Sequence, residues 1–423
     1  MPILPRSFRE FLAVMDRSRE VRAALALYIL DSRLSPPLTS GKARDPASST
    51  QAPPQTPPDR LTPLREALAF LETLPRENGR VVLSLEQGGL VRVSPDDELA
   101  GLRKDVAWLE RGEAGLLDVL AENFPGSMSG LTQELSRLED HLGDRSWHCL
   151  LADRDGTLNT YCGLYRTAVQ PAWNAVFLTR FVLTRVRWPV LLSSGPLEGL
   201  EALSTMPSGT CILAGSKGRE YRDLAGRRGA WEVAPGQLAV LDAFTRRLED
   251  LLAQPEYAAF GLVGSGLQRK LGQTTVARQD VYGSIPAAKS EQFLATLRQL
   301  VTACDPAGEV LRLEDTGLDV EILLTVEGPD GLKDFDKGDA TRFLDTRLGL
   351  DLARGPNLVC GDTAADLRML EASMTACPET WAVFVTRDKN LAQKARDICP
   401  KVSLASSPDT LMMALGKRGL RKY

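Results

Sequence analysis

Two aspartates, Asp153 and Asp155, follow the apolar stretch WHCLLA and precede Gly156. At the end of an extended strand, side chains two residues apart point to the same side. We expect both carboxylates at the carboxyl edge of a buried parallel sheet, where α/β proteins bind ligands. One carboxylate can attack phosphorus and form an aspartyl-phosphate, while its partner protonates the leaving oxygen and later activates water. An Asp-Gly turn in a surface loop is the alternative interpretation.

A second acidic group, GDTAAD, follows the apolar stretch NLVC. If a helix starts near Thr363, Asp362 and Asp366 lie one turn apart and face the same side. Together with Asp153 they would supply hard oxygen ligands suited to Mg²⁺, and the backbone carbonyl of Asp155 could add another. A helix N-terminus with favourable acidic side chains is the alternative. The repeated order of strand and acid favours a metal site.

A third apolar stretch ends in Ser193, Ser194 and Gly195. A hydroxyl group and the nearby backbone amides could bind phosphoryl oxygens there. An ordinary turn is the alternative.

One lysine, Lys337, stands just before a helical stretch. A lysine is needed to offset the combined negative charge of the carboxylates and a phosphoryl group. Lys333 and Lys289 are rivals for this role, and a solvated surface lysine is the alternative for each.

Apolar strands alternate with helical stretches around these motifs, which predicts an α/β fold with a doubly wound, Rossmann-like parallel sheet. The expected strands begin at Trp147 and cover 188–196, 209–218, 357–366 and 380–386. The expected helices cover 166–185, 196–204, 236–253 and 338–348. Residues 258–326 break the alternation and predict an inserted α+β domain, so that the core comprises 146–257 and 327–423.

The first 145 residues are expected to form a mainly helical accessory region. Residues 1–34 hold one helix, and the Pro-rich stretch 35–60 predicts a linker. We therefore expect the first helix to be tethered to the protein rather than integral to it. Residues 61–145 are expected to be helical apart from two strands around a Gly-Gly turn. This region offers a surface for self-association or protein contacts.

The bulk composition excludes several classes of protein. The 423 residues carry a formal net charge of −4, which gives no global drive toward nucleic acid or an anionic membrane. The seven cysteines include no CxxC pair and argue against a disulfide framework or a zinc site. We expect neither a signal peptide nor a membrane span, and the cytoplasm is the expected location.

The order DRDGT, LLSSG, lysine before a helix and GDTAAD resembles the haloacid-dehalogenase phosphatases over residues 146–423. The resemblance implies that Asp153 is the nucleophile and Asp155 the acid/base. It further implies that Ser194 binds the phosphate and that Lys337 is the cation that stabilises it. It also implies a Mg²⁺ site surrounded by Asp153, Asp155, Asp362 and Asp366.

The insert most resembles the cap of the trehalose-6-phosphate phosphatases. The matching segments are LAGSKGREYRD, LQRK, TTVARQD and GLDVEI. The resemblance implies a cap that closes over the sugar, with substrate-binding residues Lys217, Gly218, Lys270, Arg278 and Glu321. The chain departs from the family pattern at Lys217, Thr363 and Pro196, where His, an acidic residue and Arg are usual.

The function implied by this resemblance is hydrolysis of a sugar phosphate monoester, with trehalose 6-phosphate preferred. A glucosyl- or mannosyl-glycerate phosphate, or the corresponding glycerol phosphate, is the close rival. A non-catalytic regulatory protein is the rival from another class, and a phosphomutase is a third option.

Overall fold

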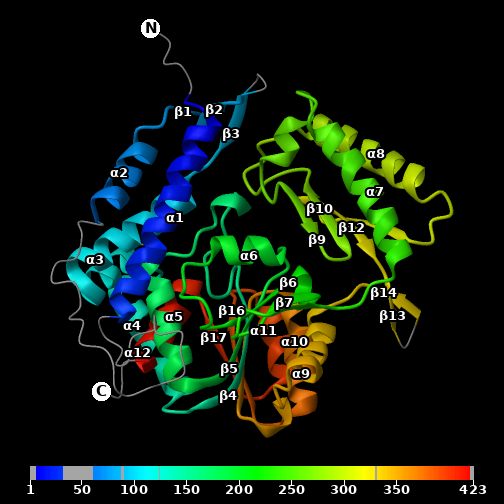
Figure 1. The fold of residues 1–423 in the computed structure, drawn as a ribbon. Coiled ribbons are helices and arrows are strands. Elements are labelled where there is room, and N and C mark those ends of the chain that lie inside the picture. The colour runs from blue at the N-terminus through cyan, green and yellow to red at the C-terminus, as the bar shows by residue number, and fades with distance from the viewer. Residues whose placement is uncertain (1–5, 32–60, 87–89, 123, 329–330, 420–423) are drawn as a thin grey trace, which may run out of the picture.

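The computed structural model describes residues 6–31, 61–86, 90–122, 124–328 and 331–419 (Figure 1). The expected linker at 35–60 and the Gly-Gly turn lie outside these residues. The central sheet contains β4 (Trp147–Asp153), β5 (Val186–Leu192), β6 (Ile212–Gly215), β7 (Glu220–Arg222), β8 (Arg228–Ala230), β15 (Asn357–Gly361), β16 (Thr380–Val385) and β17 (Val402–Ala405). Their spatial order is β17-β16-β15-β4-β5-β6-β7-β8, and only the pairings of β7 and β8 are antiparallel within this sheet.

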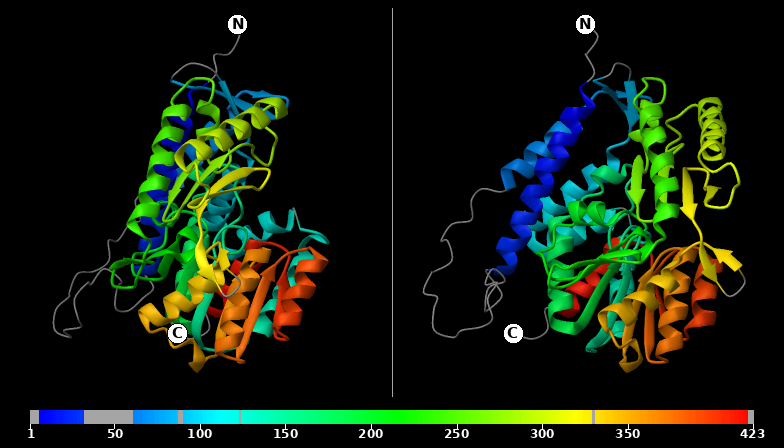
Figure 2. Two further views of the ribbon diagram at one scale, coloured as in Figure 1. Left: turned by 90° about the vertical axis from the view of Figure 1, so that its right-hand side faces the viewer. Right: turned by 45° about the vertical axis from the view of Figure 1, so that its right-hand side comes forward.

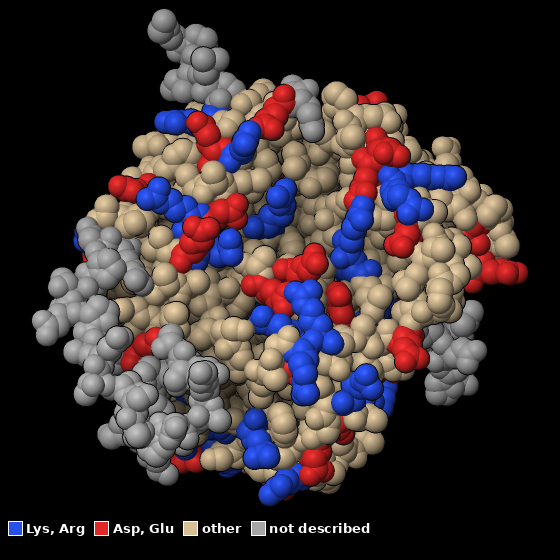
Figure 3. Space-filling view, viewed as in Figure 1, with Lys and Arg blue, Asp and Glu red and all other residues tan. Residues whose placement is uncertain are grey.

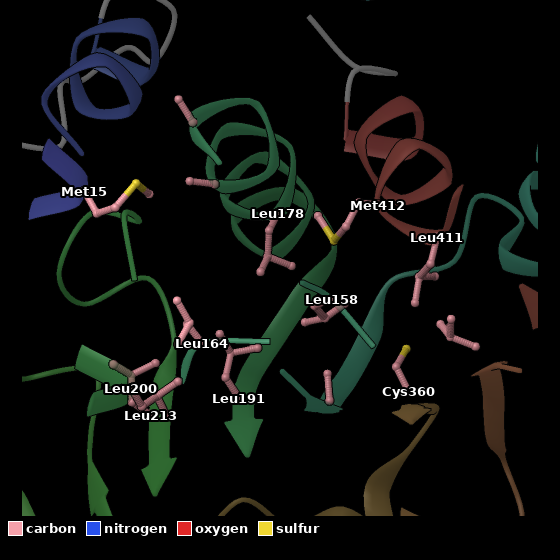
Figure 4. Close-up of a cluster of buried hydrophobic side chains, with 14 of the residues drawn as sticks. Met15, Leu158, Leu164, Leu178, Leu191, Leu200, Leu213, Cys360, Leu411 and Met412 are labelled. Carbon is pink, nitrogen blue, oxygen red and sulfur yellow. The ribbon is translucent and has the colours of Figure 1, made fainter. Parts of the chain in front are cut away.

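Helices cover both faces of this sheet, which confirms the doubly wound α/β architecture. The helices of the core are α5 (Ala172–Arg185), α6 (Leu197–Leu203), α9 (Lys337–Leu348), α10 (Ala364–Ala376), α11 (Lys389–Ile398) and α12 (Pro408–Gly419), with short 3₁₀ turns η1 (Tyr165–Thr167), η2 (Ser216–Gly218) and η4 (Leu352–Arg354). Successive residues of β4 point to opposite faces, so Leu150 joins one buried cluster and Leu151 the other. On the first face, Leu191 of β5 lies below Leu178 of α5 and Met412 of α12 (Figure 4).

The insert and the helix that precedes it form a second layered unit above the core (Figure 2). It contains β9 (Leu267–Lys270), β10 (Gln273–Ala277), β11 (Leu311–Asp315) and β12 (Asp319–Leu324), with α7 (Pro235–Leu252), η3 (Ala258–Gly261) and α8 (Ala287–Cys304). The antiparallel sheet has the order β11-β12-β10-β9. A hairpin of β13 (Val326–Gly328) and β14 (Gly331–Lys333) leads back to the core. We call residues 235–326 the cap.

The boundary expected at residue 258 separates α7 from the elements on which it packs. Helix α7 contacts α8, η3, β10 and β12. Its buried residues include Phe244 and Leu248, and Thr245 Oγ1 lies 2.6 Å from Thr274 Oγ1 of β10. We therefore propose that the cap begins at α7, because the apolar face of this helix covers the cap sheet. The sequence did not indicate this, since a helix between two units can be buried against either.

The N-terminal region contains α1 (Phe8–Asp31), α2 (Leu61–Glu72), β1 (Arg76–Glu77), β2 (Arg80–Ser84), β3 (Leu90–Val93), α3 (Asp96–Glu122) and α4 (Ser127–Leu142). Helix α1 packs on α5 of the core, and Phe11, Met15 and Leu30 are buried in the same apolar cluster as the core face. The expectation that the first helix is tethered rather than integral is therefore wrong. Its amphipathic pattern could not reveal which partner it packs against.

A buried ion pair reinforces this attachment. Arg22 of α1 donates to Asp105 of α3 at 2.6 Å, and both side chains are at most 2% exposed. Asp105 also accepts a hydrogen bond from the backbone N of Trp173, at the start of α5, at 3.2 Å. Burial raises the pKa of Asp105, and the charge of Arg22 opposes this shift. The carboxylate thus links α1, α3 and the core.

Two further expectations concern membranes and disulfides. Within the described ranges, no helix is both long and apolar enough to span a bilayer. All seven cysteines are free thiols in the structure.

Replacing Arg22 by Met should destabilise the protein by about 3–5 kcal/mol, because Asp105 would stay buried without its cation. The double variant Arg22→Met/Asp105→Asn should recover most of this loss, since Asn keeps an acceptor for Trp173 N and carries no charge. Urea unfolding of the three proteins measures the differences. If the single variant cost less than about 1 kcal/mol, the pair would not support the attachment of α1.

Candidate active site

Three acidic side chains meet at the carboxyl ends of two neighbouring strands. Asp153 ends β4, and Asp362 follows β15, which pairs with β4 in parallel. Carboxylate oxygens of Asp153, Asp362 and Asp366 lie within 4.8 Å of one another. The structure thus brings together the side chains of three of the four residues expected around the metal.

The close approach of Asp362 to the first motif depends on Gly156. Its φ is +88°, and a Cβ atom there would overlap the Asp362 carboxylate. Thr157 Oγ1 donates to Asp362 Oδ1 at 3.0 Å. The glycine therefore lets the loop after β4 turn sharply beside the second acidic motif.

Asp366 is held by the start of α10, as the GDTAAD motif predicted. Thr363 is the N-cap and forms a capping box with Asp366. Asp366 Oδ2 accepts hydrogen bonds from the backbone N atoms of Asp362 and Thr363, at 3.0 and 2.9 Å. Burial raises the pKa of Asp366, but the charge of Lys337 and these hydrogen bonds outweigh it, so that the pKa lies below its ordinary value.

Lys337 lies between two of the carboxylates. It is the first residue of α9, whose N-cap Asp336 forms a capping box with Asp339. Its Nζ is 2.5 Å from Asp153 Oδ1 and 2.5 Å from Asp366 Oδ1, and the residue is 4% exposed. Burial lowers the pKa of Lys337, but the two carboxylates overcome this and raise it above its ordinary value.

Of the two rivals of Lys337, the structure places Lys289 away from this site. Lys289 of α8 lies over the ring of Phe260 in the cap, with Nζ 5.8 Å from the ring centroid. The side chain of Lys333 lies outside the described part of the structure.

The carboxylates outnumber the cations at this site. Burial and the neighbouring charges of Asp362 and Asp366 raise the pKa of Asp153 well above its ordinary value, although Lys337 lowers it. Burial and the charge of Asp366 raise the pKa of Asp362 to about 6. The three clustered carboxylates form a set of oxygen donors that fits a hard divalent cation, and the single ammonium group neutralises only part of their charge.

Asp155 does not join this cluster with its side chain. The carboxylate pairs with Arg154, and its Oδ2 lies 3.5 Å from Ser193 Oγ. The metal contact expected of the Asp155 backbone carbonyl stays a prediction, and only the side chain lies outside the cluster. The cause is local: β4 ends at Asp153, so the strand periodicity that would align the two aspartates stops there.

Both serines after β5 face the site. Ser193 and Ser194 line the same cavity as Asp153. Ser193 is 2% exposed, and its Oγ accepts a hydrogen bond from the backbone N of Gly195 at 3.0 Å. Ser193, which the sequence placed in the same motif, therefore joins Ser194 as a candidate phosphate binder.

The site opens into a cavity of about 230 Å³ between core and cap. On the surface, side chains of both signs gather around the hollow at the centre of this face (Figure 3). The core wall comprises Asp153, Asp155, Ser193, Ser194, Lys337 and Asp362, with Tyr161 and Tyr165 of the following loop. The cap wall includes Ser265, Gln268, Lys270, Thr275, Asp319 and Glu321. The cavity is thus acidic at its base and polar on the opposite side.

The cap residues form a row across the sheet. Thr275 of β10 lies opposite Gln268 of β9 and Glu321 of β12. Lys270 and Asp319 stand two residues from Gln268 and Glu321, on the same face of their strands. Burial, with the charge of Lys217, lowers the pKa of Lys270 to about 8, and Glu321 opposes this.

Three expected substrate-binding residues do not line the cavity within the described residues. Lys217 pairs with Asp334 at 2.6 Å and with Glu321 at 3.4 Å. Gly218, with φ +89°, packs on α9, where a Cβ would overlap Ala340. Their expected contact with substrate is not supported by this arrangement, because both hold η2 against its neighbours.

Arg278 is the third. It follows the last residue of β10 and is bound by two cap acids, Asp315 and Glu291. Its guanidinium is thus committed to ion pairs on the cap, so the expected contact with substrate is not supported. Sequence reasoning instead missed Tyr161 and Tyr165, which follow the DRDGT motif, and Asp319, which lies within the GLDVEI segment.

Comparison with known proteins places this arrangement in a family. Residues 150–411 match the model of the trehalose-6-phosphate phosphatase C-terminal domain, which is more than half of the chain. A trehalose-phosphatase of Caenorhabditis elegans is 29% identical over 370 residues, covering 78% of this chain and 82% of that protein.

A longer relative is α,α-trehalose-phosphate synthase [UDP-forming] 2 of Caenorhabditis elegans, which is 31% identical over 345 residues. The match covers 77% of this chain and 28% of that protein, so the chain spans less than a third of that relative's length. Among solved structures, the C. albicans trehalose-6-phosphate phosphatase C-terminal domain aligns at a TM-score of 0.43 with 13% identity, covering 67% of this chain and 96% of that chain. On the family match, this chain belongs to the trehalose-6-phosphate phosphatase family.

Proposed function

We propose that this chain is a Mg²⁺-dependent phosphatase that hydrolyses trehalose 6-phosphate to trehalose and phosphate. The observation that carries the proposal is the buried Asp153 carboxylate, 2.5 Å from Lys337 Nζ, at the base of a cavity with a polar opposite wall. Membership of the family and the names of the phosphatase relatives favour this sugar phosphate over the glycerate and glycerol alternatives.

In the proposed reaction, Asp153 attacks phosphorus and forms an aspartyl-phosphate. Lys337 is placed to offset the charge of the phosphoryl oxygens, and Ser193 and Ser194 to bind them. Asp155 protonates the leaving sugar oxygen and then activates water, a role that its position outside the carboxylate cluster leaves open to it. When bound among Asp153, Asp362 and Asp366, Mg²⁺ would supply further positive charge.

On the sugar side, the row of cap residues offers both donors and acceptors. Gln268, Thr275 and Glu321 can bond sugar hydroxyls, and Lys270 supplies a positive charge. Tyr161 and Tyr165 of the core loop add two aromatic side chains to the lining. This mixture of groups is suited to a polyhydroxylated phosphate ester rather than to an apolar one.

The first test is phosphate release from a panel of sugar phosphates by the purified chain with Mg²⁺. Trehalose 6-phosphate should be the preferred substrate, and Asp153→Asn should lower kcat by about 10³-fold or more, because the nucleophile is lost. Asp242→Asn, an exposed change on α7, is the control and should retain full activity. Equal turnover of all esters would defeat the substrate assignment, and no Mg²⁺-dependent hydrolysis at all would favour a regulatory protein.

Adding Mg²⁺ should raise the thermal unfolding temperature of the wild type, because a ligand that binds only the folded state stabilises it. Asp362→Asn should abolish most of this shift while raising stability without metal, since it removes one of three repelling carboxylates. As the control, Mg²⁺ should raise the unfolding temperature of Asp242→Asn as much as that of the wild type. The metal assignment fails if Mg²⁺ stabilises the Asp362 variant as much as the wild type.

The KM for a sugar phosphate should rise about 10-fold as the pH increases through 8, because Lys270 loses its proton and its charge. The charge of the substrate does not change in this pH range, because the second pKa of a phosphate monoester is about 6. Lys270→Met should show a high KM that does not vary between pH 7 and 9. A wild-type KM that is constant across this range would show that Lys270 does not contact the substrate.

A further inference from the structure

Three parts of the molecule meet at one carboxylate of the N-terminal region. Asp97 lies in the first turn of α3, and its Oδ2 accepts a hydrogen bond from the backbone N of Gly163 at 3.1 Å. The same oxygen accepts a hydrogen bond from Tyr282 Oη, also at 3.1 Å. Gly163 belongs to the core loop that lines the cavity, and Tyr282 to the cap loop between β10 and α8. Asp97 therefore bridges core and cap.

The two bridged loops also touch each other directly. A Cβ atom at Gly163 would lie 2.6 Å from Tyr282 Cε2, so the ring packs closely on this glycine. The backbone N of Tyr165 donates to the carbonyl oxygen of Gly264 of the cap at 2.9 Å. Burial and the charge of Asp97 raise the pKa of Tyr282, so the phenol keeps the proton that it donates. This contact lies beside the residues that line the cavity.

A second side chain of the N-terminal region binds the same cap loop. Arg80 of β2 donates to the carbonyl oxygen of Tyr282, and to Ser284 Oγ at 3.2 Å. The loop is a defined turn, because Asp280 Oδ1 accepts hydrogen bonds from the backbone N atoms of Tyr282 and Ser284, at 3.0 and 2.9 Å. Arg80 and Asp97 thus hold a preorganised segment of the cap from two sides.

We propose that Asp97 and Arg80 are positioning residues that hold the cap loop 280–284 against the core loop 159–167, so that the N-terminal region fixes the placement of the cap relative to the core. This inference rests on the proposed function for its catalytic consequence. A cap that is held in place presents Lys270 and Glu321 to a bound sugar phosphate from the start. Without the clamp, a large substrate must bring the cap into position itself, which weakens its binding.

Hydrogen–deuterium exchange on the full chain tests the clamp without requiring catalysis. In Asp97→Ala, backbone amides of 278–286 and 159–168 should exchange at least about 10-fold faster than in the wild type, while the strands of the core sheet stay unchanged. Asp118→Ala is the matched control, because Asp118 lies on the same helix in an exposed ion pair with Arg111. Unchanged exchange in both loops of the Asp97 variant would overturn the proposal.

Steady-state kinetics on two substrates of different size distinguish a positioning role from a general loss of stability. Asp97→Ala should raise the KM for trehalose 6-phosphate about 10-fold, as expected for the loss of a charge-assisted hydrogen bond, and leave kcat within about twofold. It should not change kcat/KM for p-nitrophenyl phosphate, which is too small to reach the cap residues. Asp97→Asn keeps an acceptor, so its KM should rise less than that of Asp97→Ala. Gly163→Ala should raise the KM as much as Asp97→Ala, because it displaces the Tyr282 ring.

Equal losses on both substrates would contradict the clamp, since they would indicate damage to the phosphoryl site. If the wild type hydrolysed neither ester, the proposed function would fail while the exchange measurement would still decide the positioning role.

Discussion

The contact of Lys337 with Asp153 and Asp366 is the constraint on which the site depends. All three residues are at most 5% exposed, and each buried charge would cost several kcal/mol without its partners. They come from the end of β4 and from the starts of α9 and α10. The parallel pairing of β4 with β15 and the capping boxes of the two helices fix these three segments. The three charged side chains are therefore held within contact distance at the edge of the sheet.

The remaining charge at this edge explains why it suits phosphoryl chemistry. Asp362 adds a third carboxylate, and Lys337 alone does not balance the cluster, which is why burial and repulsion raise the pKa of Asp153 and Asp362. A divalent cation would offset this excess negative charge and leave Lys337 available to the oxygens of a phosphoryl group. Asp155 stands apart from this cluster and is paired with Arg154, which separates the acid/base candidate from the metal candidates.

Helix α3 attaches the N-terminal region to both other parts of the molecule through acidic side chains. Asp97 contacts the cap and the core loop, and Asp105 contacts Arg22 and the start of α5. Between them, Glu98 accepts a hydrogen bond from Thr167 of the same core loop, and burial raises its pKa to about 7. The N-terminal region is therefore packed against the cavity wall rather than attached as a separate unit (Figure 1).

Features that depend on local pattern could be predicted from the sequence. Apolar strands that end in acidic residues predicted the parallel sheet and the meeting of Asp153, Asp362 and Asp366, because carboxyl ends of neighbouring parallel strands share an edge. The start of α10 at the GDTAAD motif followed from capping chemistry.

The partners of charged side chains outside these motifs became apparent only in the folded protein. Arg278 is bound by Asp315 and Glu291, and Lys217 by Asp334, partners that lie 13 to 117 positions away in the chain. The packing partners of α7 and α1 were likewise not predictable. Their amphipathic patterns indicated which face of each helix is buried but not the surface against which it packs. The physical reason is that charge pairing and apolar burial depend on distance in space, whereas the periodicity of a sequence records only which side of an element turns inward.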